Sequence, residues 1–298
     1  MIPFKDLMLE DKETITKYTM NSNRRNCDLS FSNLCSWRFL YDTQFVEIDG
    51  FLVLKFRARE KLAYMTPVGE GDLKKVIVAL EENAREEKED FYMLGVTPDM
   101  KEEIEAAMPG RFTFTANRDY ADYIYLRTDL ANLTGKKYQS KRNHINKFKK
   151  IYHYEYIPLS PEHIRECLRL EAEWCKTNHC EEQEGMLNER RAIVYALTHF
   201  EKLGLTGGLL CVNSKIAAFT FGMPINRDTF GVHVEKADTN IDGAYAMINY
   251  EFANHIPEQY TYVNREEDLG VEGLRKAKLS YQPAIILEKS ETKLTSNS

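Results

Sequence analysis

The order of strand and helix patterns in the second half of the chain constrains the fold most. The pattern opens with a strand at 154–159, after which Ser160 and Pro161 give an N-cap and a proline in the first helical turn. Helices are then predicted at 161–177 and 183–203, strands at 205–212, 215–223 and 229–236, a helix at 243–254, a strand at 260–264, a helix at 270–280 and a strand at 283–288. This succession predicts an α/β unit.

The first half carries a second α/β pattern. Residues 45–57 predict two strands joined by a tight Asp49-Gly50 turn. Further strands are predicted at 62–69, 91–97 and 111–127, and helices at 72–89 and from Pro98 to near Pro109. We therefore expect an N-terminal unit at 1–130, a connecting helix at 131–153, a C-terminal unit at 154–290 and a flexible polar tail at 291–298.

Length and charge narrow the class of protein. The chain has 298 residues, about twice the ~150 residues of an average domain, and 43% of them are hydrophobic. Lys and Arg total 40 against 46 acids, which excludes a uniformly basic coat for nucleic acid. No apolar run approaches the ~18 residues of a membrane span, and acids stand where a signal peptide needs a basic region. We expect a soluble, cytoplasmic protein without a transmembrane segment.

The six cysteines form no CxxC motif and no regular framework, so we expect reduced thiols. Cys175, His179 and Cys180 lie within six residues and offer three zinc ligands. A fourth ligand at a diagnostic spacing is missing, so we predict no metal site.

A basic segment separates the two halves. No acid occurs between Asp129 and Glu155, although the segment holds seven cations: Lys136, Lys137, Lys141, Arg142, Lys147, Lys149 and Lys150. At helical spacing an apolar stripe is made by Tyr138, Ile145, Phe148 and Tyr152. The pattern predicts a helix that docks by this stripe and presents cations to the phosphates of nucleic acid or anionic lipid. We expect phosphate contacts from Lys141, Arg142, Lys147 and Lys150; the alternative is a solvated linker helix.

Three further stretches are informative together: SFSNLCSWRF at 30–39, GKKYQSKRNHINKFKK at 135–150 and NREEDLGVEGLRKAKLSYQP at 264–283. They resemble the phosphatidylglycerol lysyltransferase C-terminal-domain family. The resemblance implies two tandem GNAT-like domains with mixed sheets flanked by helices, similar to the Fem-type peptidyltransferases. It also implies transfer of an aminoacyl group from aminoacyl-tRNA. The sequence lacks the membrane-spanning half of the lipid-modifying relatives, which leaves a small-molecule, lipid or peptide acceptor open.

The implied reaction asks little of the protein. An aminoacyl ester or thioester is already activated, so the protein must align the partners, take a proton from the acceptor and stabilise the oxyanion. Alternation along 231–235 places His233 and Glu235 on one face of a strand. Because GNAT enzymes often use a glutamate on the corresponding strand, Glu235 is our first candidate for the general base and His233 the second. The alternative is a cross-strand ion pair without chemistry.

Other residues bear on the donor and the pocket. The turn at 240–244 has one glycine and places Asp242 where a GNAT enzyme holds the pyrophosphate of acyl-CoA. We therefore expect aminoacyl-tRNA as the donor and no tightly bound cofactor. The rivals are an acyl-CoA-dependent N-acyltransferase acting on a small amine, and a non-catalytic module that binds RNA or anionic surfaces.

The stretch from 264 to 278 supplies most of the expected pocket. Its acids can hold a substrate ammonium, or they can simply cap the following helix. In that helix Leu274, Ala277 and Tyr281 are predicted to form the apolar face, with a lysine at its edge that snorkels outward or binds an anion. The expected substrate-binding residues are Tyr245, Asn264, Arg265, Glu267, Asp268 and Lys278.

Overall fold

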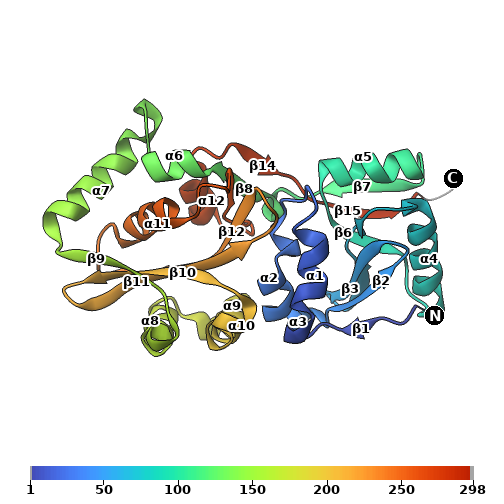
Figure 1. The fold of residues 1–298 in the computed structure, drawn as a ribbon, viewed down its shortest axis with the longest axis horizontal. Helices are drawn as coiled ribbons and strands as arrows, with labels where there is room; N and C mark the ends of the chain where they lie inside the picture. The colour runs from blue at the N-terminus through green and yellow to red at the C-terminus, as the bar shows by residue number, and fades with distance from the viewer. Residues whose placement is uncertain (1, 296–298) are drawn as a thin grey trace.

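The structure is a computed structural model that describes residues 2–295 and contains two sheets flanked by helices (Figure 1). The first sheet has the order β1-β2-β3-β4-β6-β15-β7, with β5 paired to β3. Its strands are β1 (Lys5–Asp6), β2 (Gln44–Ile48), β3 (Phe51–Ala58), β4 (Lys61–Tyr64), β5 (Val68–Gly69), β6 (Tyr92–Val96), β7 (Phe112–Ala116) and β15 (Ser290–Leu294). All of its pairs are antiparallel except β4 with β6.

The second sheet has the order β14-β8-β13-β12-β11-β10-β9. Its strands are β8 (Asp122–Leu126), β9 (Tyr154–Pro158), β10 (Thr206–Val212), β11 (Lys215–Pro224), β12 (Thr229–Ala237), β13 (Tyr262–Asn264) and β14 (Ile285–Leu287). Strands β12 and β13 run parallel, and the other neighbours are antiparallel. The prediction of two mixed sheets flanked by helices is confirmed.

Helices cover both sheets. The first sheet is accompanied by α1 (Lys12–Thr19), α2 (Phe31–Ser36), α3 (Arg38–Tyr41), α4 (Leu73–Glu86) and α5 (Pro98–Ala107). The second is accompanied by α6 (Arg127–Asn132), α7 (Gln139–Ile151), α8 (Ile164–Thr177), α9 (Glu184–Thr198), α10 (Phe200–Leu203), α11 (Ala244–His255) and α12 (Glu272–Leu279). Short 3-10 turns lie at Leu9–Asp11, Cys27–Leu29, Arg118–Tyr120, Lys136–Tyr138, Pro161–His163 and Cys180–Glu182. Figure 1 shows α8 to α10 on one side of the second sheet and α11 and α12 on the other.

Two cores hold these layers together. One extends from the first sheet to the α8–α10 side of the second, and it joins Leu54 and Leu80 with Leu197 and Phe219. The other lies between the second sheet and helices α7 and α11, and it contains Phe148, Val263 and Phe252. Because the first core draws on both sheets, the two halves of the chain pack as neighbours.

Local patterns predicted most elements well. Strands β2 and β3 form the expected hairpin, in which Asp49 and Gly50 take φ of 48° and 86° in the left-handed region that a tight turn requires. Helix α7 buries Ile145 and Phe148 as expected, the preceding 3-10 turn buries Tyr138, and Tyr152 is partly buried against the same core. The apolar stripe of the basic segment is therefore confirmed.

Strand pairing corrects two expectations. Residues 111–127 were expected to close the first unit, but β8 pairs with β13 and β14 in the second sheet. The prediction of a flexible tail is wrong for 291–294, because β15 pairs with both β6 and β7 and fully buries Thr292. Residues 296–298 of that tail lie outside the described residues, and the boundaries at 130 and 153 stay predictions.

The cysteines bring a third correction. The side chains of Cys175 and Cys180 are joined as a disulfide, so reduced thiols are the wrong expectation for this pair and they offer no zinc ligands. The thiols of Cys27, Cys35, Cys167 and Cys211 are free. In the described part of the chain, no helix is long and apolar enough to cross a membrane.

Candidate functional site

Glu235 and Arg265 meet just beyond the residues through which the parallel strands β12 and β13 pair. The Arg265 Nη2 atom lies 3.2 Å from Glu235 Oε1, and the two side chains are only 13% and 14% exposed. Asn249 of α11 donates its Nδ2–H to Glu235 Oε2 at 3.4 Å. The sequence placed the first two residues in one pocket, and the structure joins them directly.

Aromatic rings and a second cation surround this pair. The guanidinium carbon of Arg265 lies 5.0 Å from the centre of the Tyr281 ring and 5.7 Å from that of Tyr125. The ammonium of Lys141 lies 4.0 Å above the same Tyr281 ring, in cation–π contact. Burial, together with the charge of Arg265, lowers the pKa of Lys141. Lys141 and Arg265 therefore share the Tyr281 ring, which places a second cation beside Arg265.

Two buried polar atoms at this site have no protein partner in the described chain. They are Nη1 of Arg265, a donor, and Oδ1 of Asn249, an acceptor. A buried polar atom without a partner is costly, so such atoms mark places where a ligand can complete the hydrogen bonding. A ligand that accepts from arginine and donates to the amide oxygen fits this arrangement.

His233 lies two residues from Glu235 but makes contacts of its own. Its Nε2 is 2.7 Å from Ser30 Oγ, and its Nδ1 is 2.8 Å from Glu266 Oε1. The His233 side chain is 3% exposed. Both ring nitrogens are occupied, so the imidazole can accept a proton from a substrate only if this network breaks.

Tyr245 lies on α11, at the edge of the site. Its hydroxyl accepts a hydrogen bond from Trp174 Nε1 at 2.7 Å, and the residue is 39% exposed. Burial raises the pKa of Tyr245 to about 12, and the charge of Glu235 adds to the rise. Tyr245 is thus a neutral hydroxyl that a bound molecule can reach.

The remaining predicted pocket residues hold the loop after β13. Asn264 is fully buried and donates to the Arg25 carbonyl and to Asp122 Oδ2, both at 2.7 Å. Lys278 donates to the carbonyls of Arg265, at 2.6 Å, and Glu267. Lys278 therefore neither snorkels outward nor meets a carboxylate. The predicted apolar face of α12 is wrong for Leu274 and Ala277, which are exposed, whereas Tyr281 is buried.

Asp268 anchors the same loop. It is fully buried, and Arg275 donates to both of its carboxylate oxygens at 2.8 Å. The hydroxyl of Tyr123 also donates to it, at 2.5 Å. The hydrogen bonds from Arg275, together with that from Tyr123, hold the pKa of Asp268 well below its usual range.

Replacing Asp268 by asparagine should lower the free energy of unfolding by about 2–4 kcal/mol at pH 7, because the buried arginine contacts lose their countercharge. A carboxyl whose pKa is depressed by folding stabilises above its unfolded pKa and loses that effect as the pH falls. The difference in the free energy of unfolding between wild type and the Asp268→Asn variant should therefore become smaller below about pH 4. Chemical denaturation at pH 7 and pH 3.5 measures it.

Asp119→Asn is the matched control for that prediction. Asp119 also accepts from Arg275, at 2.6 Å, but its side chain is 47% exposed. Its loss should cost about 1 kcal/mol or less. Equal losses in the two variants would contradict the anchoring role of Asp268.

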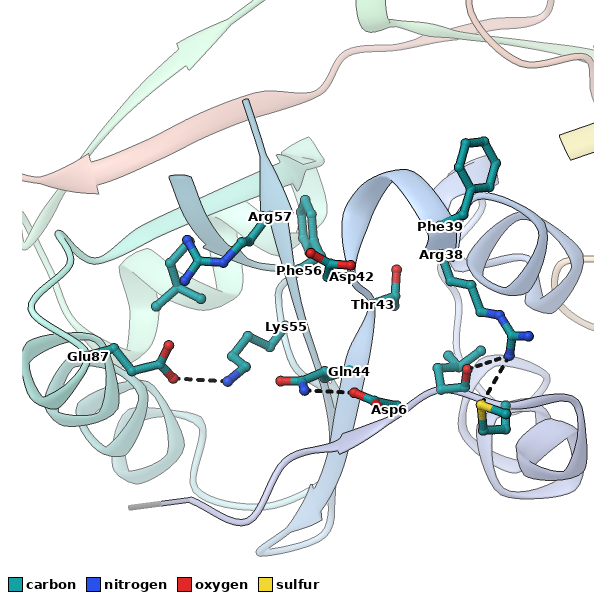
Figure 2. A pocket seen from close by; sticks show the side chains of 13 residues that line it. Asp6, Arg38, Phe39, Asp42, Thr43, Gln44, Lys55, Phe56, Arg57 and Glu87 are labelled. Atoms are coloured by element: carbon teal, nitrogen blue, oxygen red, sulfur yellow. Dashed lines mark hydrogen bonds and ion pairs between the residues drawn. The ribbon is translucent and has the colours of Figure 1, made fainter. Parts of the chain in front are cut away.

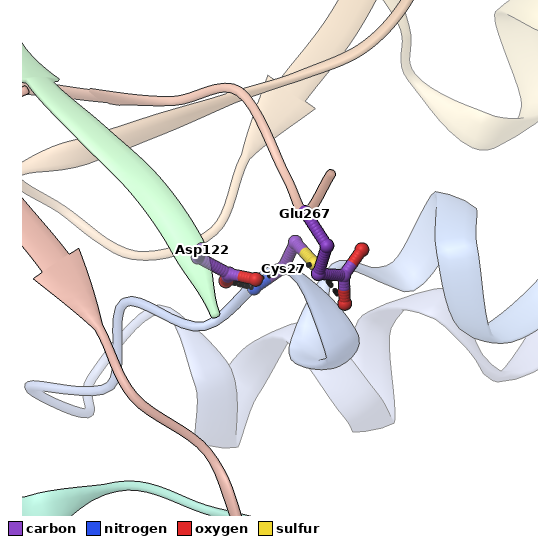
Figure 3. Close-up of side chains that lie close together, drawn as sticks. All are labelled: Cys27, Asp122 and Glu267. Atoms are coloured by element: carbon purple, nitrogen blue, oxygen red, sulfur yellow. Dashed lines mark hydrogen bonds between the residues drawn. The ribbon is translucent and has the colours of Figure 1, made fainter. Parts of the chain in front are cut away.

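A buried charge cluster lies next to the loop (Figure 3). Cys27, Asp122 and Glu267 bring potential metal ligands within 4.8 Å of one another. The ammonium of Lys289 already lies among them, 2.8 Å from Asp122 Oδ1 and 2.5 Å from Glu267 Oε1. It also pairs with Asp28 at 3.0 Å. Burial, opposed by Lys289 and reinforced by Asp122, raises the pKa of Glu267 to about 7. A lysine thus supplies the positive charge that a metal ion would bring.

The family of the chain follows from comparison with known proteins. The sequence profile described as phosphatidylglycerol lysyltransferase, C-terminal, matches residues 19–290. The chain belongs to this family. The curated proteins searched contain no match.

Solved structures agree with the family. A conserved protein of unknown function from Bacteroides thetaiotaomicron is 70% identical, with a TM-score of 0.97 over 99% of this chain and 100% of that one. The L-PGS structure from Bacillus licheniformis is 15% identical, with a TM-score of 0.69 over 100% and 95%. A tandem GNAT protein from the clavulanic acid biosynthesis pathway is 10% identical, with a TM-score of 0.50 over 99% of each chain. The last two likenesses show the fold, which is that of two GNAT-like domains. Family and fold together indicate an acyl or aminoacyl transferase.

The basic helix of this lysyltransferase-family chain presents fewer free cations than its sequence suggests. Arg142 donates from Nη1 to the carbonyls of Leu133, at 2.5 Å, and Gly135, at 2.6 Å. Lys147 pairs with the exposed Asp242 at 2.6 Å. Lys150 is exposed beside a shallow groove of about 400 Å³ that Lys147 also lines. Their contacts with phosphate stay predictions.

A separate cavity of about 570 Å³ lies in the first unit of this family member (Figure 2). Two of its charged groups, Lys55 and Glu87, pair with each other at 2.9 Å, and Gln44 donates to Asp6 at 2.8 Å. None of the site residues predicted from the sequence lines it.

Three residues at or beside the site escaped sequence reasoning. Ser30 and Asn249 are single polar residues in otherwise ordinary stretches, and Lys289 directly follows the strand predicted at 283–288, where no role was expected for it. The SFSNLCSWRF stretch was the one signal for Ser30, since it carries part of the family resemblance.

Proposed function

We propose that this protein transfers an aminoacyl group from aminoacyl-tRNA to an amine or hydroxyl acceptor by direct attack. The observation that carries the proposal is the Glu235–Arg265 pair, flanked by Lys141, in a member of the lysyltransferase family. It unites a carboxylate that can take a proton with an arginine N–H that lacks a partner. These are the base and the oxyanion donor that acyl transfer requires.

The proposed step balances without an enzyme nucleophile. The acceptor attacks the carbonyl carbon of the aminoacyl ester while Glu235 takes the acceptor's proton. Nη1 of Arg265 donates to the developing oxyanion. The new amide or ester bond forms as the bond to the ribose oxygen breaks, and the proton passes from Glu235 to that oxygen, which becomes the free ribose hydroxyl.

The other predicted residues have supporting parts in this proposal. Tyr245 lines the edge of the pocket beside Glu235. Asn264, Glu267, Asp268 and Lys278 hold the loop that carries Arg265. Four cations of α7 contact the tRNA phosphates in this proposal: Lys141, Arg142, Lys147 and Lys150. The start of α11 supports tRNA over acyl-CoA, because the exposed Asp242 lies beside the turn that would receive the pyrophosphate.

Donor binding tests the proposal. Purified protein is titrated with aminoacyl-tRNA, the same tRNA uncharged, and acetyl-CoA at 50 mM and 200 mM salt. We expect charged tRNA to bind at least about tenfold more tightly than uncharged tRNA, since only the charged form offers the aminoacyl group. Both tRNA affinities should fall as salt rises, because phosphate contacts release counterions.

Variants separate the pocket from the basic helix. Lys147→Ala combined with Lys150→Ala should weaken charged and uncharged tRNA equally, whereas Tyr245→Ala should reduce only the preference for charged tRNA. Binding of acetyl-CoA alone would replace the proposal by an acyl-CoA-dependent N-acyltransferase. Equal binding of charged and uncharged tRNA would contradict aminoacyl transfer and would favour a non-catalytic RNA-binding module.

A further inference from the structure

We propose that Ser30 and Asn33, from the N-terminal half of the chain, are positioning residues for the Glu235–Arg265 site in the C-terminal half. They act through Glu266, which directly follows Arg265. The inference rests on the proposed function for the role of that site, but the contacts that carry it do not depend on the reaction.

Four side chains form a continuous hydrogen-bonded network. Ser30 Oγ lies 2.7 Å from His233 Nε2, and His233 Nδ1 lies 2.8 Å from Glu266 Oε1. Asn33 donates its Nδ2–H to the same Glu266 oxygen at 2.7 Å. Ser30 immediately precedes α2 and Asn33 lies in it, whereas His233 is on β12. The network therefore ties the N-terminal half to the loop that begins with Arg265.

The backbone of Glu266 needs such support. Its φ is 60°, in the left-handed region that costs a residue with a side chain about 1–2 kcal/mol. Conformations of this kind persist where the surroundings hold them, and they gather at functional sites. The Glu266 N–H donates to Asn264 Oδ1 at 2.7 Å, and its side chain is fixed by His233 and Asn33. Both ends of Glu266 are therefore held, which fixes the direction in which Arg265 leaves the loop.

The order serine, histidine, glutamate has the geometry of an activated nucleophile. The burial of Ser30 and His233 favours a positioning role for the network instead. Ser30 is 1% exposed, the His233 side chain is 3% exposed, and neither cavity described above is lined by Ser30. A substrate carbonyl has no open path to the hydroxyl, so the network acts on the site through Glu266.

Hydrogen exchange on the full chain without substrate tests the positioning. Ser30→Ala and Asn33→Ala should each speed amide exchange in residues 264–270 by about three- to tenfold, the effect of losing one hydrogen bond that holds the loop. Ser36→Ala is the matched control. Ser36 is likewise a buried serine, at the end of α2, but its Oγ has no hydrogen-bond partner in the described chain, so this variant should leave exchange in 264–270 unchanged.

Kinetics supply the second readout. Ser30→Ala should lower kcat for aminoacyl transfer by about tenfold with a smaller change in KM, because a displaced Arg265 weakens oxyanion binding more than substrate binding. Ser30→Thr keeps a hydroxyl and should restore most of the rate.

Each result decides one question. Unchanged exchange in 264–270 for Ser30→Ala and Asn33→Ala would overturn the positioning role. Labelling of Ser30 by a fluorophosphonate probe would also overturn it, since that would show a reachable nucleophile. If the loop loosens while the wild-type protein transfers no aminoacyl group, the positioning stands and the proposed function fails.

Discussion

Glu235→Gln should lower kcat for aminoacyl transfer by about two to four orders of magnitude, the usual contribution of a general base. A glutamine keeps one acceptor oxygen, which can take the hydrogen bond from Arg265 that Glu235 accepts at 3.2 Å. Its NH2 group cannot accept from Asn249 as Glu235 does at 3.4 Å, so this contact is kept only when the Asn249 amide turns and accepts instead. The glutamine cannot take a proton from the acceptor. Single-turnover assays with labelled aminoacyl-tRNA and a panel of primary amines and hydroxyl compounds measure the loss.

Glu251→Gln is the control for this effect. Glu251 is a carboxylate on the same helix as Asn249, but it accepts from Tyr154 at 3.2 Å, toward β9. This variant should transfer at the wild-type rate. Full activity of Glu235→Gln would show that another group takes the proton, and the assignment of Glu235 as base would then be wrong.

Lys289→Met should destabilise the protein more than any other single change discussed. The ammonium is 3% exposed and lies within 3.0 Å of Asp28, Asp122 and Glu267. Removing one partner of a buried ion pair costs about 3–5 kcal/mol, and here three carboxylates lose their countercharge together. Since whole domains are stable by only about 5–15 kcal/mol, we expect a greatly lowered Tm or a loss of folded protein.

The pH dependence of the stability of Lys289→Met tests whether the buried carboxylates cause the loss. Without Lys289 the buried carboxylates should have raised pKa values, so the folded variant binds more protons than the unfolded chain and gains stability as the pH falls from 8 to 5. Adding Glu267→Gln to the Lys289→Met variant should restore part of the stability at pH 8. Thermal unfolding at both pH values measures these effects.

Lys293→Met provides the comparison on the same strand. Lys293 belongs to β15, but its side chain is 58% exposed and pairs with Glu291 at 3.4 Å. Its replacement should change stability by less than about 1 kcal/mol. Similar losses in the two lysine variants would mean that β15 itself, rather than the buried charge, explains the effect.

Sequence reasoning succeeded where the deciding contacts are local. The Asp49-Gly50 turn, the helical spacing of α4 and the apolar stripe of α7 each depend on residues a few positions apart. The pairing of strands that lie far apart in the sequence is not indicated by any comparable local pattern. Strand β8 looks like any short strand, and nothing in its sequence tells which of two sheets it joins.

In the candidate site, too, local patterns could be predicted from the sequence and contacts between distant segments could not. Glu235 and Arg265 were both expected in the pocket because strand alternation and the stretch after β13 point to them. Their direct contact requires the parallel pairing of β12 with β13, which the sequence does not reveal. The neighbours Lys141 and Arg142 illustrate the limit. One turns to the Tyr281 ring and the other to backbone carbonyls, a difference that the packing of α7 decides.

The placement of β15 between β6 and β7 has a consequence for protein synthesis. A ribosome completes both neighbours long before residues 290–294 emerge, so the nascent first sheet has two unpaired edges in its interior. Such edges can pair with other chains. The first sheet can therefore close only after most of the second has been translated. An isolated fragment of residues 1–130 would keep that gap, and chaperones that shield exposed strand edges during translation should raise the yield of folded protein.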